Sequence, residues 1–254
     1  VLGARFNLPL EGLASTICER FYLLPLLLTA LPLTRGIDVL FDRMLQTLET
    51  SAPLVVATAT LSIIVGYNDV REHHRPDVEL YLANTLAAAP PDAVLLGSGD
   101  HRLYGFWYLQ RVLGVAPGVV YVDPQMLHYP WYRRQVETSL GLGLEGIAPG
   151  NIDTARLAAG LLAAGRPVYL TNRFSQGISR QFATYPIGTL IHVLPPGARP
   201  PPPTELERMN LAVSARFLHA ASAPSDPNGW AYHVQGDYIR PWRALADAYT
   251  SLGR

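Results

Sequence analysis

Cysteine is almost absent from this chain of 254 residues, because Cys18 is the only one. An internal disulfide and a cysteine-rich metal cluster are therefore excluded. Charge is also scarce: 16% of the residues are charged, against about 25% in an average soluble domain. The 20 basic and 20 acidic residues balance one another, so no net field favours nucleic acid as a partner.

Sequence motifs of two common enzyme classes are missing as well. No serine stands in a G-x-S-x-G turn, and there is no Walker loop, so the sequence does not indicate an α/β-hydrolase or a P-loop NTPase. The chain begins at Val1 within a loop-like segment. We expect it to be the carboxyl-terminal piece of a longer protein.

Two apolar stretches are present instead, an uncharged one at 21–33 that could extend to 36 and an uncharged one at 52–66. Each is just short of the roughly 17 residues that a membrane span needs. Between them, apolar residues from Ile37 to Leu48 follow helical spacing along one face. We predict an external loop over 1–20 and a membrane hairpin over 21–66, with buried core helices as the alternative.

The pattern changes at residue 67, and from there to 194 strand-like runs alternate with helix-like ones. Alternation of this kind is typical of a parallel sheet covered by helices. Buried strands are predicted at 93–96, 119–122 and 167–170, with an edge strand at 189–194. Helices are predicted at 78–89, 100–113, 132–140 and 155–164, the last of them capped by Asn151 or Asp153.

The last part of the chain is predicted to be helical after a proline-rich spacer at 195–203. Thr204 and Glu207 have the spacing of a capping box, and Pro241 is expected at the start of a final helix. The predicted fold class is therefore α/β: two short membrane-type helices, a small parallel-sheet domain over 67–194 with helices packed on it, and terminal helices over 204–254.

Polar residues follow the first two predicted strands, where ligand-facing groups of α/β units usually lie. Asp100 and His101 come after the turn Gly97-Ser98-Gly99, and Asp123 ends the second strand. We expect these three side chains on one edge, as acid, base or ligand groups, with helix capping as the alternative. The turn does not complete a dinucleotide fingerprint, because Arg102 replaces its third glycine.

A second candidate site lies just after the second strand. Tyr129, Trp131 and Tyr132 are followed by Arg133 and Arg134, a combination that suits a sugar or a lipid headgroup, although such residues also serve as core and rim. The adjacent pair at 73–74 is histidine, but neighbouring side chains diverge and the i, i+4 spacing of metal ligands is missing. We expect no metal and no cofactor.

Several residues between 77 and 135 resemble the signature of a known family: Gly99-Asp100, Phe106 to Gln110, Gly114, Val119 to Val122, Leu127 and Trp131-Tyr132. The family consists of bacterial multi-span membrane proteins of unknown function, related to protein O-mannosyltransferases and so to type C glycosyltransferases. The match is looser outside this region. It departs at His101, where the family usually has Asn, and at Leu103 and Tyr104, where an acid and Thr are common.

The resemblance implies that this is the carboxyl-terminal part of an inner-membrane glycosyltransferase with a polyprenyl-phosphate sugar donor, its α/β domain being periplasmic. Enzymes of this kind carry their catalytic acid in the first external loop, so we name no catalytic residue here and expect the piece alone to be inactive. Its expected partners are membrane lipid, the lipid-linked sugar, and a protein or glycan acceptor. They would dock at Asp100, His101, Asp123, Trp131 and Arg133. A soluble α/β module for a small molecule or a nucleotide is the alternative.

Overall fold

The computed structural model of this chain describes residues 75–144, 153–171, 176–224 and 229–251, together with residue 227 and short pieces between 28 and 67. The chain divides into two compact units. The first consists of Val1–Pro76 and Ala221–His233, and the second of Asp77–Ala220 and Val234–Arg254. Most of the predicted membrane hairpin lies outside the described residues. Within the described part, no helix is both long enough and apolar enough to cross a membrane.

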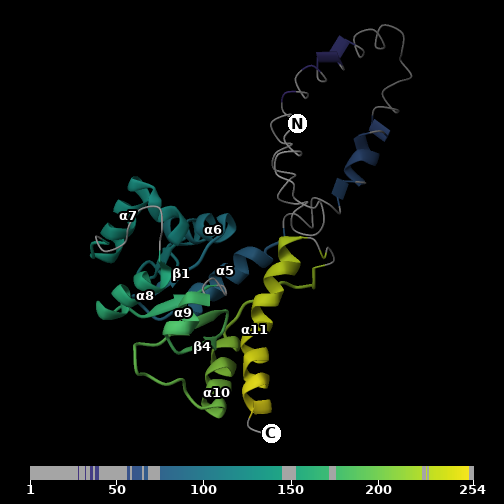
Figure 1. The fold of residues 1–254 in the computed structure, drawn as a ribbon. Coiled ribbons are helices and arrows are strands. Elements are labelled where there is room, and N and C mark those ends of the chain that lie inside the picture. The colour runs from purple at the N-terminus through teal and green to yellow at the C-terminus, as the bar shows by residue number, and fades with distance from the viewer. Residues whose placement is uncertain are drawn as a thin grey trace. The chain divides into compact units, whose positions relative to one another are not determined.

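The second unit contains one five-stranded sheet with helices packed on it (Figure 1). The order of its strands is β2-β1-β3-β5-β4. Three parallel strands, β1 (Val94–Leu96), β2 (Val120–Val122) and β3 (Val168–Leu170), confirm the three predicted buried strands. The fold is therefore α/β, as predicted.

The sheet is mixed rather than parallel, because β4 (Thr184–Ile187) and β5 (Leu190–Val193) form an antiparallel hairpin. The predicted edge position of 189–194 is wrong, since β5 lies between β3 and β4. Only two residues join β4 to β5, and the first, Gly188, has a φ of 58°. So short a connection forces the two strands to run antiparallel. β4, which the pattern did not indicate, takes the edge.

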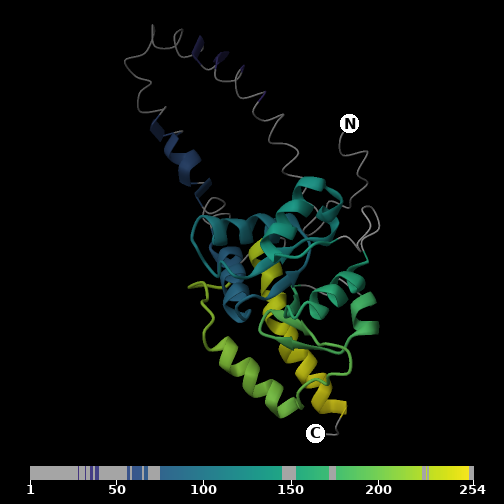
Figure 2. The same cartoon turned by 90° about the vertical axis from the view of Figure 1, so that its left-hand side faces the viewer.

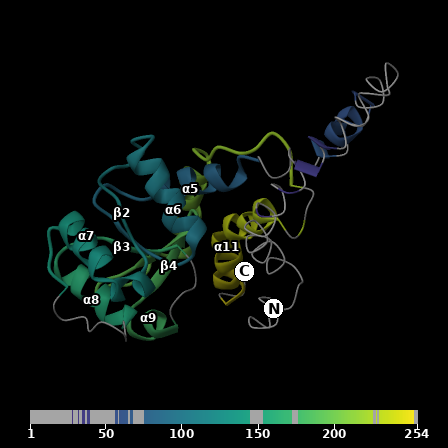
Figure 3. The ribbon, with the colours of Figure 1, turned by 90° about the horizontal axis from the view of Figure 1, so that it is seen from above.

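Helices cover both faces of this sheet. The sequence β1, α6 (Asp100–Arg111) and β2 is a parallel crossover unit. Seen from above, α6 and α5 (Asp77–Ala88) lie on one side of the strands, and α7 (Pro130–Leu140) and α8 (Thr154–Ala163) on the other (Figure 3). The short 3-10 helix η2 (Pro124–His128) links β2 to α7, and α9 (Gln176–Gln181) follows β3.

Residues at their own ends determine where α7 stops and where α8 begins. Asp153 caps α8, as predicted: its carboxylate accepts from the amides of Ala155 at 2.9 Å and Arg156 at 3.2 Å. Gly141 ends α7 in the left-handed conformation, with a φ of 62°. The helices are thereby fixed against the core, which includes the fully buried Val94 and Phe106.

The two carboxyl-terminal helices differ from prediction at their starts. α10 (Pro203–Ser214) begins one residue before the predicted capping box, and no side chain caps it. That box is wrong: proline presets the first turn, and Glu207 accepts a hydrogen bond from the Tyr249 hydroxyl at 2.7 Å. This bond joins α10 to the second half of α11 (Trp230–Ser251), which lies beside it (Figure 2).

Pro241 lies inside α11 rather than at its start, so that prediction is wrong too. An interior proline costs a helix one backbone hydrogen bond. Here Pro241 is itself buried, and Val234 and Leu245 on the same helix are 3% and 7% exposed. Packing of these apolar residues outweighs the lost bond, and the sequence pattern alone does not show that packing.

Candidate binding site

Asp123 stands at the carboxyl end of β2 and is 5% exposed. Its carboxylate accepts from the Gln125 amide at 2.9 Å, which caps η2. Burial raises the pKa of this carboxyl, and the amides of Gln125, Gly99 and Met126 counteract that rise. The capping alternative for this aspartate is therefore what the structure shows, and its oxygens point at backbone amides.

Asp100 and His101 form the first turn of α6. Asp100 is exposed, and it lies near enough to Asp123 for its charge to raise the pKa of that carboxyl. The ring of His101 lies against Gly99, whose φ of 110° few other residues adopt. The structure thus brings the predicted trio to one edge, but with Asp123 engaged by its own turn.

Near this trio, α5, α6 and α11 contribute the members of an ion network. Asp237 accepts from the Tyr81 hydroxyl at 2.7 Å and pairs with Arg102 at 3.0 Å and with Arg240. Arg102 also donates to the carbonyl of Ser98 at 3.2 Å. We call Tyr81, Arg102, Asp237 and Arg240 the ion network.

The ion network occupies the place where an α/β protein usually binds a dinucleotide, between strands whose connections diverge. Arg240 reaches the carbonyl of Thr171 at the end of β3, at 3.4 Å. A Cβ on Gly97 would collide with the Thr171 hydroxyl oxygen. The turn at Gly97 is therefore packed closely against Thr171, with the ion network beside it.

Trp131, at the start of α7, belongs to a cluster of mutually packed rings. Ring centroids lie 6.5 Å apart for Trp107 and Trp131, 6.4 Å for Tyr129 and Trp131, and 5.8 Å for Tyr104 and Trp107. Tyr132 lies beneath them, fully buried. The other rings reach the surface: Tyr104, Tyr129 and Trp131 are 59%, 43% and 48% exposed. These five residues form the aromatic platform.

Arg133 does not join the platform in the way the sequence suggests. Its side chain is 16% exposed, lies 3.4 Å from the Glu137 carboxylate and donates to the carbonyl of Leu144. Arg111 supplies the positive charge instead, with its guanidinium 5.1 Å from the Trp107 ring centroid. The predicted combination of aromatic and basic groups exists, with a different arginine.

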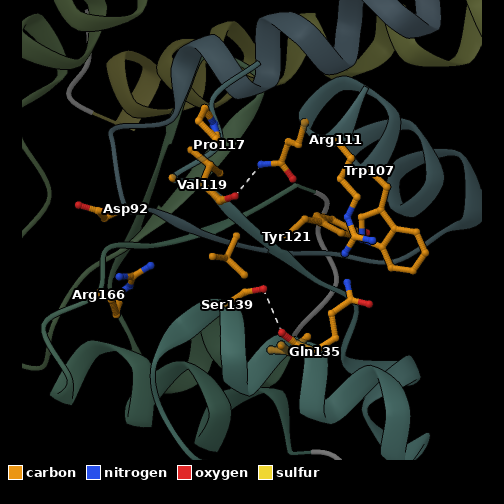
Figure 4. Close-up of a pocket in the computed structure, with 13 residues that line it drawn as sticks. Asp92, Trp107, Arg111, Pro117, Val119, Tyr121, Gln135, Ser139 and Arg166 are labelled. Carbon is orange, nitrogen blue, oxygen red and sulfur yellow. Dashed lines mark hydrogen bonds between the residues drawn. The ribbon is translucent and has the colours of Figure 1, made fainter. Parts of the chain in front are cut away.

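A pocket of about 430 Å³ adjoins the platform, with Trp107 in its wall (Figure 4). It lies at the outer edge of β2, between α6 and α7. Arg111 and Trp107 stand at one end, Arg166 and Asp92 at the other, and Gln135 and Ser139 of α7 on one side. Its volume is within the range of about 300–1,000 Å³ that is usual for ligand sites.

The charge of this pocket is positive, with two arginines against one aspartate. Neither Arg111 nor Arg166 has an ion pair within the part of the chain that the structure describes. The Nε of Arg166 is buried and has no hydrogen-bond partner there. An unpaired buried donor is costly, and this nitrogen is closed off from solvent.

Sequence reasoning missed the pocket as a whole. One signal was available, because Trp107 and Arg111 are four residues apart and so neighbour each other on a helix. Nothing in the sequence indicated Arg166 or Asp92. They lie in segments before β3 and β1, and only the pairing of these strands brings them to the pocket. Among the described residues no cluster of His, Cys, Asp and Glu is arranged to hold a metal ion. His73 and His74 lie outside those residues.

The groups at this site are ones that can bind a polar ligand. Aromatic faces, side-chain amides, a hydroxyl and guanidinium groups surround the pocket and the platform, and no nucleophile is paired with a base there. No protein-family model, curated protein or solved structure matches this chain.

Proposed function

We propose that this chain is the docking part of a membrane glycosyltransferase-like protein, and that the aromatic platform holds the sugar of a polyprenyl-phosphate donor. The observation that carries the proposal is the set of exposed, mutually packed rings around Trp107 and Trp131, next to a polar pocket. The resemblance to relatives of protein O-mannosyltransferases points to the same substrate class.

Sugars suit such a surface for a physical reason. One face of a pyranose ring is lined by C–H groups, which pack on an aromatic ring, while its hydroxyl groups need hydrogen-bond partners. Trp131, which is 48% exposed, offers the ring. The side-chain amide of Gln135 and the hydroxyl of Ser139 line the adjoining pocket and offer the partners.

Membrane attachment is the second part of the proposal, and the described residues between 56 and 64 support it. All of them are helical and exposed. Val56, Leu61, Ile63 and Ile64 have between 61% and 69% of their surface exposed. Contiguous exposed apolar side chains are typical of a surface that meets lipid or a partner. In this proposal the α/β unit lies on the periplasmic side of the bacterial inner membrane.

The proposal assigns catalysis to the part of the protein that carries the external catalytic loop, so this piece alone is inactive. Asp100, His101 and Asp123 would then hold the turn beside the platform rather than perform chemistry. The engaged carboxylate of Asp123 agrees with a positioning role.

The test is a titration of the full chain, in detergent, with a short-chain polyprenyl-phosphate mannose, followed by tryptophan fluorescence. Removal of the Trp131 ring in Trp131→Ala should weaken binding about fivefold, because stacking on one ring contributes on the order of 1 kcal/mol. Tyr232→Ala removes an aromatic side chain that is 50% exposed outside the platform, and it should bind like the parent chain.

Two results would contradict the proposal. One is an equal loss of affinity in both variants, which would show that the aromatic platform does not hold the sugar. The other is equally tight binding of free mannose 1-phosphate and of the lipid-linked sugar, which would favour the soluble small-molecule alternative.

A further inference from the structure

We propose that the outer edge of β2 docks an extended, acidic polypeptide segment, seated in the pocket between α6 and α7. The proposal deepens the proposed function and rests on it in one respect: the segment would belong to the protein that accepts the sugar. The argument for a peptide comes from the backbone of β2 and from the charge of the pocket.

β2 is an edge strand, so the backbone N–H and C=O groups of every second residue point away from β1. Val120 donates to the carbonyl of Ala93 at 2.9 Å, and Gly97 donates to the carbonyl of Val122 at 3.1 Å. Since these two residues face β1, the N–H and C=O groups of Tyr121 between them face away from it. Tyr121 lines the pocket.

Side chains close this edge on both sides of Tyr121. The Gln110 amide donates to the carbonyl of Val119 at 2.6 Å. The amide of Asp123 donates to the Tyr132 hydroxyl at 2.9 Å. Within the described residues, the outward N–H and C=O of Tyr121 are thus the one backbone pair on this edge that has no protein partner.

An extended peptide complements such a pair. In a strand, the N–H and the C=O of one residue point to the same side, so one residue of a guest peptide that runs antiparallel to β2 bonds to both groups of Tyr121. The Val119 carbonyl and the Asp123 amide already have hydrogen-bond partners. Backbone pairing with a guest peptide is therefore confined to about one residue of β2. The edge is therefore suited to a short segment and protected against open-ended strand addition.

Charge and shape determine which peptide fits. Arg111 and Arg166 stand at opposite ends of the pocket (Figure 4), so acidic side chains on both sides of the paired residue would each meet a guanidinium. Arg111 is held in place by its contact with Trp107, which lowers the entropy lost on binding. Asp92 beside Arg166 makes that end the less positive of the two.

The experiment uses the full chain with selective ¹⁵N-tyrosine labelling, in detergent. The probe is a pool of capped pentapeptides, Ac-Glu-Xaa-Xaa-Xaa-Glu-NH₂, in which Xaa is Val, Thr, Ser or Ala. We expect the Tyr121 amide signal to shift and its hydrogen exchange to slow. The double variant Arg111→Gln with Arg166→Gln should weaken binding at least tenfold. Arg199→Gln, an exposed arginine outside the pocket, should leave it unchanged.

Two matched pools make the test decisive. A pool that is N-methylated at the three central positions cannot donate to the Tyr121 carbonyl, and a pool with Lys in place of Glu reverses the charge; both should lose binding. Equal binding of either pool, or no shift at Tyr121 with millimolar acidic peptide, overturns the inference.

The variant Trp131→Ala separates this inference from the proposed function. It should bind the acidic peptides normally, because Trp131 does not line the pocket. Peptide binding without sugar binding in the parent chain would support the peptide site while the proposed function fails. Sugar binding that depends on Trp131, without peptide binding, would support the proposed function while the peptide site fails.

Discussion

The carboxyl ends of the parallel strands and the outer edge of β2 are built in opposite ways. At the first, the ion network ties Asp237 to Tyr81 and Arg102. At the second, a pocket of about 430 Å³ remains next to two arginines without ion partners in the described part of the chain. Parallel α/β sheets usually bind ligands at the first place.

The contrast teaches that α11 changes the chemistry of the strand ends, because it brings charged side chains to them. Asp237 and Arg240 come from that helix, more than a hundred residues after Asp100, and complete the carboxyl-end cluster. β2 has only one neighbouring strand and keeps an accessible side. A pocket is therefore found at the sheet edge, although a sequence-based expectation would place the ligand site at the strand ends.

Loss of the Asp237 carboxylate should be the most damaging single change. In Asp237→Ala two arginines with 12% and 14% of their side chains exposed lose their counter-charge, and the free energy of unfolding should fall by about 3 kcal/mol. Urea denaturation measures it. Glu205→Ala, which removes an ion pair on the surface of α10, should cause no measurable change. Similar midpoints for the two variants would show that the ion network does not stabilise this edge.

A methyl group at Gly97 tests directly whether the strand ends are filled. Because its Cβ would collide with Thr171, Gly97→Ala should lower the free energy of unfolding by about 2 kcal/mol. Thermal and urea unfolding should both detect this loss, and adding Thr171→Ala should restore most of it. Gly160→Ala, where nothing lies within 4 Å of the new Cβ in the helix α8, should stabilise the protein by about 0.5–1 kcal/mol. Full tolerance of Gly97→Ala would mean that this edge has room for a ligand after all.

The smallest expected effect depends on pH and concerns Asp123. Burial raises the pKa of this carboxyl above its value in the unfolded chain, so its contribution to stability is present at low pH and is lost as the pH rises through the folded pKa. Asp123→Asn does not titrate. The stability of the variant relative to the parent should therefore increase as the pH rises from about 3 to about 7, and urea unfolding at several pH values measures it. A constant difference would show that the carboxyl titrates normally.

Local sequence signals predicted the parts of the fold that depend on short segments. The apolar runs at β1, β2 and β3 were recognisable because strands buried on both faces contain few polar residues. The cap at Asp153 followed from its own side chain. β4 was missed because it contains Pro186 and its burial is only partial, so the period of its side chains is weak.

The candidate site was only half predictable for a similar reason. Trp131 and its neighbours were visible as a cluster in the sequence, and Asp100 and Asp123 could be placed at one edge because parallel strands end together. The inward turn of Arg133 toward Leu144 depends on where the chain returns after α7. Arg166 enters the pocket from the segment before β3, through a strand pairing that no local pattern specifies.

By itself, the sequence determined the α/β alternation, the low charge and the aromatic cluster, because these depend on residue types at short separation. Only the tertiary structure decided that an ion network would form at the strand ends and that a pocket would lie at the edge of β2. The physical reason is that both features require residues distant in the chain to meet: Asp237 with Arg102 in one case, and Arg111 and Arg166 around Tyr121 in the other.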